Sequence, residues 1–137
     1  MTRLVLVLVL VLVLDPAVRA DPTPAWELVA PEKLELTAGA ATTFDLDIVP
    51  AEDRTISRDG PVRIDVKVPA GVTTSRRRLA LSDAGDPAAR APRFSIKLTA
   101  AKAGSYDVEL RVRFWLCSRQ SCKPVRTSKK LSIVVKA

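Results

Sequence analysis

The chain has 137 residues, a formal net charge of +7, two cysteines and no histidine. Without histidine the usual general base is missing, which disfavours serine- or cysteine-hydrolase chemistry, and two cysteines supply at most half of a zinc site. Aromatic residues make up only 4% of the chain, so no stacking platform for nucleic-acid bases is indicated. The composition therefore predicts no metal site, no cofactor and no nucleic-acid partner.

Residues 1 to 20 have the pattern of a cleaved secretory signal peptide. Arg3 precedes an eleven-residue run of leucine and valine, and the segment ends at the small residue Ala20. Eleven helical residues rise only about 16 Å, whereas a bilayer needs roughly 20 residues. Cleavage near Asp21 is therefore favoured over a permanent anchor. We expect a periplasmic or secreted protein with no stable membrane span after cleavage.

Residues 21 to 32 contain three prolines around Trp26. Prolines at this density predict an extended lead-in rather than a domain. We expect the tryptophan to pack against the body of the protein, which residues 33 to 137 form as one domain.

The rest of the chain alternates between apolar and polar residues with period two, and no apolar period of 3.6 residues follows the signal segment. Turn residues separate the alternating segments. These segments are 33–37, 42–49, 62–68, 79–81, 93–98, 106–116 and 131–135. The pattern predicts an all-β protein, an immunoglobulin-like antiparallel β-sandwich of about seven strands. The apolar parity predicts a core that includes Phe44, Ile64, Val66, Phe94, Leu110, Val112 and Phe114.

Tyr106 begins the longest alternating segment, after a turn of small residues. A tyrosine at this place is typical of the tyrosine corner of immunoglobulin-like sandwiches, in which the hydroxyl bonds to nearby backbone. An ordinary inward aromatic residue at the start of a strand is equally compatible with the sequence.

The densest basic run is Arg76, Arg77 and Arg78. Such a run indicates either a patch for a polyanion or anionic surface, or a solvated loop end. The second interpretation is favoured, because no aromatic residues are interleaved with the charges.

Cys117 and Cys122 enclose four polar residues between two alternating segments, which predicts a β-hairpin with the cysteines facing each other. Both have the outward parity of their strands. Lys129 has the inward parity, so we expect a β-bulge within residues 127 to 130. In an oxidising compartment, an even pair of cysteines is usually joined.

The cysteine pair has two possible roles. A disulfide that closes a loop of about six residues stabilises the fold by roughly 2 kcal/mol, against about 4 for a loop of sixty, so the pair is weakly placed as a staple. Arg119 and Lys123 are near enough in sequence to favour thiolates. Trp115, on the same outward face, would shield the sulfurs, provide an apolar docking spot, or pack against a neighbouring loop.

The run from Tyr106 to Val125 resembles the end of the N-terminal periplasmic domain of the DsbD family of thiol:disulfide interchange proteins. Similar cysteine hairpins occur in β-domains appended to thioredoxin-like NHL-repeat proteins. The resemblance implies an immunoglobulin-like sandwich in which Cys117 and Cys122 cycle between dithiol and disulfide. It also implies a partner that is another exported or membrane thiol-disulfide protein. The spacing of four residues departs from the five that are usual in the family.

Two hypotheses for the function follow. The first is an exported thiol-disulfide exchange domain, a possible component of an oxidoreductase. The alternative is a non-enzymatic secreted β-sandwich, a binding or structural module with an inert hairpin disulfide. The sequence gives neither the partner nor the oligomeric state.

Overall fold

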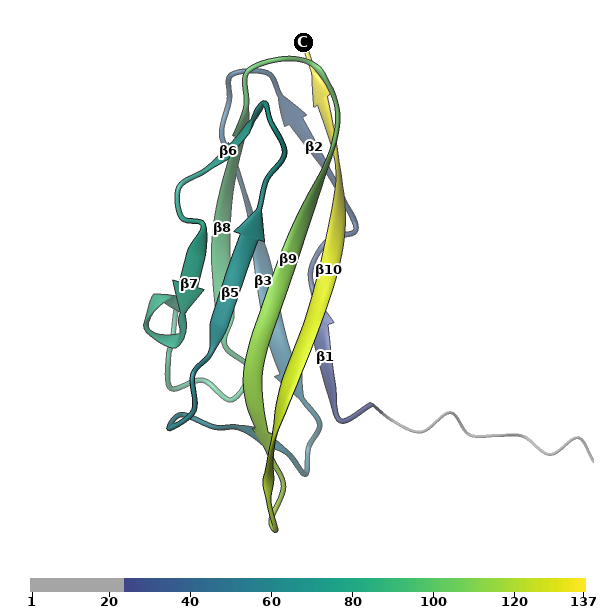
Figure 1. Ribbon diagram of the computed structural model, residues 1–137. Helices are drawn as coiled ribbons and strands as arrows, with labels where there is room; N and C mark the ends of the chain where they lie inside the picture. The colour runs from purple at the N-terminus through teal and green to yellow at the C-terminus, as the bar shows by residue number, and fades with distance from the viewer. Residues whose placement is uncertain (1–23) are drawn as a thin grey trace, which may run out of the picture.

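The computed structural model describes residues 24 to 137, and the signal peptide predicted for residues 1 to 20 lies outside this part. Two layers of strands run along the molecule (Figure 1). The strands are β1 (Trp26–Val29), β2 (Lys33–Thr37), β3 (Thr42–Pro50), β4 (Thr55–Ile56), β5 (Arg63–Lys67), β6 (Val72–Thr74), β7 (Arg78–Ala80), β8 (Arg93–Ala100), β9 (Gly104–Cys117) and β10 (Cys122–Lys136). A single 3-10 turn, Leu81–Asp83, follows β7.

The strands form two sheets. One sheet has the order β1-β3-β8-β6, and the other has the order β2-β10-β9-β5-β7, with β4 also paired to β9. All pairs are antiparallel except that of β2 with β10. The chain thus places β1 in one sheet and β2 in the other, beside the last strand. This arrangement is an immunoglobulin-like β-sandwich, as the alternation predicts.

Seven of the ten strands correspond to the alternating segments of the sequence. The additional ones are β1, β4 and β6, which have four, two and three residues. Segments this short hold few side chains to show a period, although β7, which also has three residues, is predicted from Leu79 and Leu81. The expected lead-in therefore contains a strand, because Trp26–Val29 pairs with β3.

The core lies between the sheets and is made of the inward side chains of both. All seven side chains predicted for the core are buried. The Trp26 ring meets the Phe114 ring edge to face, with the centroids 5.8 Å apart. Trp26 therefore packs against the body of the protein, as expected.

Tyr106 forms a tyrosine corner. Its hydroxyl donates a hydrogen bond of 3.0 Å to the carbonyl oxygen of Lys102, four residues earlier. A side chain at Gly71 would meet the tyrosine ring at 3.2 Å, and the φ of +93° there also favours glycine. The ring and the adjacent turn thus fix the start of β9.

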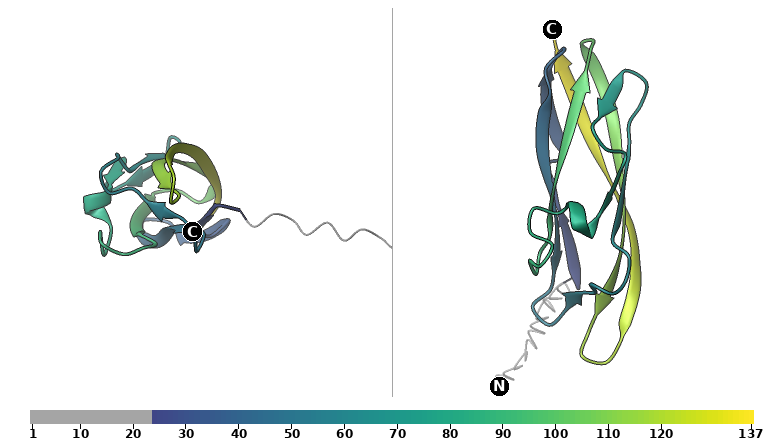
Figure 2. Two further views of the ribbon diagram at one scale, coloured as in Figure 1. Left: turned by 90° about the horizontal axis from the view of Figure 1, so that it is seen from below. Right: turned by 90° about the vertical axis from the view of Figure 1, so that its left-hand side faces the viewer.

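β9 and β10 form an uninterrupted hairpin that twists along the molecule (Figure 2). Their register is constant from Gly104 opposite Val135 to Cys117 opposite Cys122. The bulge predicted within residues 127 to 130 is therefore wrong. Lys129 faces Leu110 and is half-buried on the inner face. Since β2 pairs with β10 only from Ser132 onward, Lys129 lies at an open edge, where its aliphatic stem can cover the core while the amine stays hydrated.

Candidate functional site

The two cysteines form a disulfide at the end of the β9–β10 hairpin. They are directly opposite each other, with their Cα atoms 3.9 Å apart. Cys122 is exposed and Cys117 is half-buried. The prediction that the hairpin brings the two cysteines face to face is confirmed.

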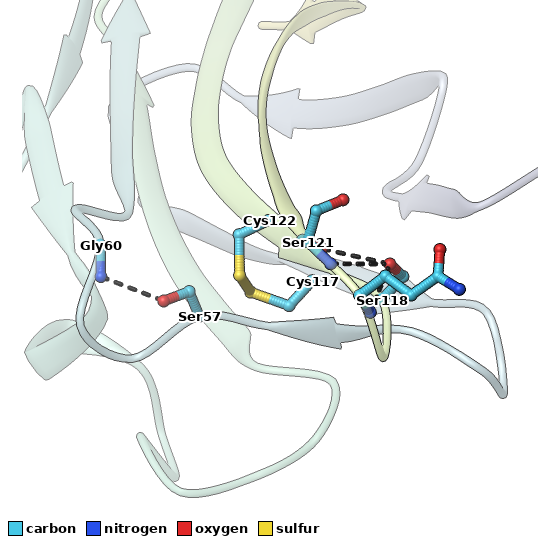
Figure 3. The surroundings of a disulfide bond; sticks show 7 residues. Ser57, Gly60, Cys117, Ser118, Ser121 and Cys122 are labelled. Carbon is cyan, nitrogen blue, oxygen red and sulfur yellow. Dashed lines mark hydrogen bonds between the residues drawn. A yellow bond between two sulfur atoms is a disulfide. The ribbon is translucent and has the colours of Figure 1, made fainter.

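Hydrogen bonds fix the turn between the cysteines independently of the disulfide (Figure 3). The Ser118 amide donates to the Ser121 carbonyl oxygen at 2.8 Å. The Ser118 hydroxyl accepts from the amides of Gln120 and Ser121, both at 3.3 Å. Ser118 therefore organises the tip, a role that the sequence analysis did not assign to it.

A neighbouring loop runs beside the disulfide. Thr55 of β4 pairs with Cys117, and the Ser57 amide donates to the Trp115 carbonyl oxygen at 2.8 Å. The Ser57 hydroxyl in turn accepts from the Gly60 amide at 3.2 Å (Figure 3). The loop thereby extends the sheet past the end of β5 and covers one side of β9.

Both cysteines line a groove of about 540 Å³ together with residues 55–59 and 88–90. Arg58 bridges the two loops, because its guanidinium donates to the Ala88 carbonyl oxygen at 2.6 Å. Arg90 also donates a hydrogen bond to the carbonyl oxygen of Ala51, in the segment that leads from β3 into residues 55–59. The cationic groups in this groove are thus Arg58 and Arg90. The sequence analysis missed them because they lie about 27 to 64 residues before the cysteines, in loops whose contacts are set by the fold.

The cationic residues next to the cysteines in sequence lie elsewhere. Lys123 is opposite Leu116, on the face of the hairpin away from the disulfide, and lines a second groove with Trp26. Arg119 is exposed within the turn. The hairpin therefore separates Lys123 from the disulfide by the thickness of the sheet.

Trp115 is 37% exposed and lies on the outward face. Its ring packs on Gly60, since a Cβ atom there would lie 2.6 Å from the Cδ1 atom of the ring. Of the three roles considered for Trp115, packing by a neighbouring loop is the one for which the structure shows a contact.

Two of the three arginines at residues 76 to 78 are paired locally. Arg76 forms an ion pair with Asp83, and Arg78 forms one with Asp65 at 3.3 Å. Burial raises the pKa of the Asp65 carboxyl, but hydrogen bonds from Arg78 and Arg63 outweigh it and hold the pKa below its usual value.

Residues 24 to 137 contain no group of three or more histidine, cysteine or acidic side chains arranged to hold a metal ion. In the same part of the chain no helix is long and apolar enough to cross a membrane.

No protein-family model and no curated protein matches the chain. Among solved structures, a cohesin module of a family 33 glycoside hydrolase from Clostridium perfringens is similar, with 12% identity, a TM-score of 0.47 and coverage of 83% of this chain and 100% of that one. Murine CRIg shares 11% identity at a TM-score of 0.45, over 82% of this chain and 98% of its own.

Domains 4 and 5 of the S-layer protein SbsC share 14% identity at a TM-score of 0.44, over 84% of this chain. The match spans about half of the S-layer chain, 54%. At these identities and scores, the similarities assign no function.

Proposed function

We propose that the protein is an exported, non-enzymatic binding or structural module that presents the tip of the β9–β10 hairpin to a partner. The observation that carries the proposal is the projection of this tip beyond the end of the sandwich (Figure 1), on a continuous ladder of strand pairs. Loops at the ends of immunoglobulin-like sandwiches are common recognition elements, because a rigid scaffold positions them.

The disulfide has a direct use in such a module. The exposed residues Arg119, Gln120 and Ser121 offer hydrogen-bond donors and acceptors at the tip. The bond between Cys117 and Cys122, together with the Ser118 hydrogen bonds, restricts the conformations of these residues before binding. Less conformational entropy is then lost when a partner binds. A disulfide is also typical of periplasmic and secreted proteins.

A photo-crosslinking amino acid placed at Gln120 in the producing cell tests this proposal. The matched control is the same amino acid at Lys102, which is exposed in the turn at the other end of β9. We expect an adduct of one defined mass from Gln120 and none from Lys102. Equal adducts from both positions, or none from either, would contradict recognition by the tip.

Thiol-disulfide exchange with another exported or membrane protein is a second candidate. The exposure of Cys122 and the groove along both cysteines support it, as does the resemblance of the hairpin to the DsbD family. In this reaction a thiolate of the partner attacks one sulfur of the bond to form a mixed disulfide, and a second thiol of the partner releases the reduced pair. Arg58 and Arg90 line this groove against one acidic residue, Asp59, so its lining carries a net positive charge, which favours the departing thiolate.

Redox titration of the folded protein against glutathione and thioredoxin separates the two candidates. A potential below about −300 mV would support an inert disulfide. Reduction at higher potentials, with a mixed disulfide captured by one of the single-cysteine variants Cys117→Ser or Cys122→Ser, would support exchange. That result would contradict the proposal of a binding module with a permanent disulfide.

A further inference from the structure

A row of three arginines crosses the outer face of the sheet that contains β9. Arg113 of β9 is directly opposite Arg63 of β5 on one side and Arg126 of β10 on the other. We call these three residues the arginine row. Neighbouring strands are about 4.8 Å apart, so the row extends roughly 10 Å across the sheet. Like charges at directly opposed positions destabilise a sheet, so stability alone does not account for the row.

Nearby carboxylates compensate the arginine row only at one end. Arg63 contacts Asp65 at 3.3 Å, but Arg78 contacts the same carboxylate at the same distance. Arg113 and Arg126 are exposed, and neither forms an ion pair with any residue between 24 and 137. Two guanidinium groups are thus available to an external anion.

The outer face of the other sheet is built differently. There Arg93 lies opposite Asp47 and donates two hydrogen bonds to its carboxylate, at 2.8 and 3.0 Å. The next pair on that face, Asp45 and Ser95, is joined by a hydrogen bond of 2.8 Å. On the outer face of one sheet, a charged side chain is thus paired with an opposite charge. On the outer face of the other sheet, three like charges lie opposite one another.

An apolar row lies next to the arginine row, on the side of the hairpin tip. It consists of Trp115 and Pro124, which are directly opposite each other. Both are exposed, and the Trp115 ring is held against Gly60. One apolar row and one cationic row thus lie side by side on the outer face of this sheet.

We propose that the arginine row, with Trp115 and Pro124, binds an acidic polysaccharide. The planar guanidinium groups fit the carboxylates of uronate residues bidentately. The apolar C–H face of a sugar ring can pack on the aromatic ring beside them. This surface is distinct from the hairpin tip, so the proposal goes beyond the function proposed above and does not depend on it.

An anionic membrane fits this face less well. Peripheral membrane binding requires apolar side chains that enter the lipid. Among residues 24 to 137 the exposed large apolar side chains are Val29 and Trp115. Val29 lies in β1 of the other sheet, so Trp115, which is 37% exposed, is the one large apolar side chain among them on this face.

Titration calorimetry of the mature protein with polygalacturonate tests the proposal, with neutral dextran as the reference polymer. We expect binding to polygalacturonate that weakens with added salt, and none to dextran. The double variant Arg113→Thr, Arg126→Thr should lose affinity by roughly tenfold or more, because two charge-assisted contacts disappear. The double variant Arg93→Thr, Lys97→Thr removes the same charge from the opposite sheet and should keep the wild-type affinity.

Three binding results would overturn the proposal. The first is no binding of polygalacturonate by the wild type, and the second is an equal loss in both double variants, which would indicate an effect of net charge alone. The third is equally tight binding of polyglutamate or of anionic phosphatidylglycerol vesicles. Thermal unfolding supplies an independent readout, since removal of the arginine row should leave the melting temperature unchanged or higher. A lower melting temperature would assign the row a structural role instead.

Discussion

Gly60 is required by the side chain above it rather than by its backbone. A Cβ atom at this position would lie 2.6 Å from the Cδ1 atom and 2.9 Å from the Cγ atom of Trp115, which are too near the backbone to move freely. We expect Gly60→Ala to lower the free energy of unfolding by about 1 to 3 kcal/mol through overpacking. Urea denaturation measures the change, and a shift in tryptophan fluorescence should accompany it.

Gly85→Ala is the matched control. A Cβ atom there would meet only the Arg93 carbonyl oxygen, at 3.9 Å, which is an ordinary contact. This variant should be as stable as the wild type or slightly more stable. If both alanine variants behave alike, Trp115 does not restrict Gly60 as described.

Asp65 should make stability depend on pH. Because the pKa of its carboxyl is lowered in the folded protein, the carboxylate stabilises the fold above the unfolded pKa of about 3.9, and this contribution is lost as the pH falls through the folded pKa. Asp65→Asn should therefore be less stable than the wild type at pH 7. The difference should shrink below about pH 4, as measured by thermal unfolding at several pH values, whereas a constant difference would contradict the role of the charge.

Inward side chains were the most predictable residues, because the parity of a strand determines which of its side chains face the core. Phe94 and Phe114 illustrate this, since both are at most 1% exposed. Lys129 shows where parity misleads. Its charge suggested an outward position and hence a bulge, but the strand is unpaired on one side at this point, and a long side chain can lie inward there without losing hydration.

At the scale of elements, the β9–β10 hairpin should survive without its disulfide. Its fourteen opposed pairs and the Ser118 hydrogen bonds hold the two strands. We expect the Cys117→Ser, Cys122→Ser variant to fold, with an unfolding free energy lower by about 2 kcal/mol, as a short closed loop implies. Chemical denaturation with circular dichroism measures this, and an unfolded variant would show that the bond is essential to the fold.

The long strands were visible in the sequence, whereas contacts between strands were not. β5 and β9 each alternate clearly, but nothing in the sequence places Arg63 opposite Arg113, fifty residues later. The register that creates the arginine row comes from the packing of the whole sheet. In the sequence, the consecutive residues Arg76 to Arg78 are the most evident basic run, although two of them are paired locally.

At the scale of the whole molecule, one apolar core joins the two sheets. Val112 is fully buried on β9, and Ser128 is exposed on the neighbouring strand. Val112→Asp should prevent folding, because it places an unpaired charge in the core. Ser128→Asp adds the same charge on the outer face opposite Arg111, and should change stability by less than about 0.5 kcal/mol. Circular dichroism of the purified variants separates the two outcomes, and equal tolerance of both would contradict the assignment of faces.

The half of β10 that has no neighbouring strand on one side affects how readily the protein associates with other copies of itself at high concentration. A strand without a neighbour can recruit one from another chain and so begin aggregation. Ser132 donates its amide away from β9 to Glu32, and Pro124 has the same parity, so its nitrogen, which carries no hydrogen, faces the open side. Lys129 would have to lose its hydration if a second strand docked there. Pro124 and Lys129 therefore disfavour the addition of a strand from another molecule at this edge, and so favour solubility.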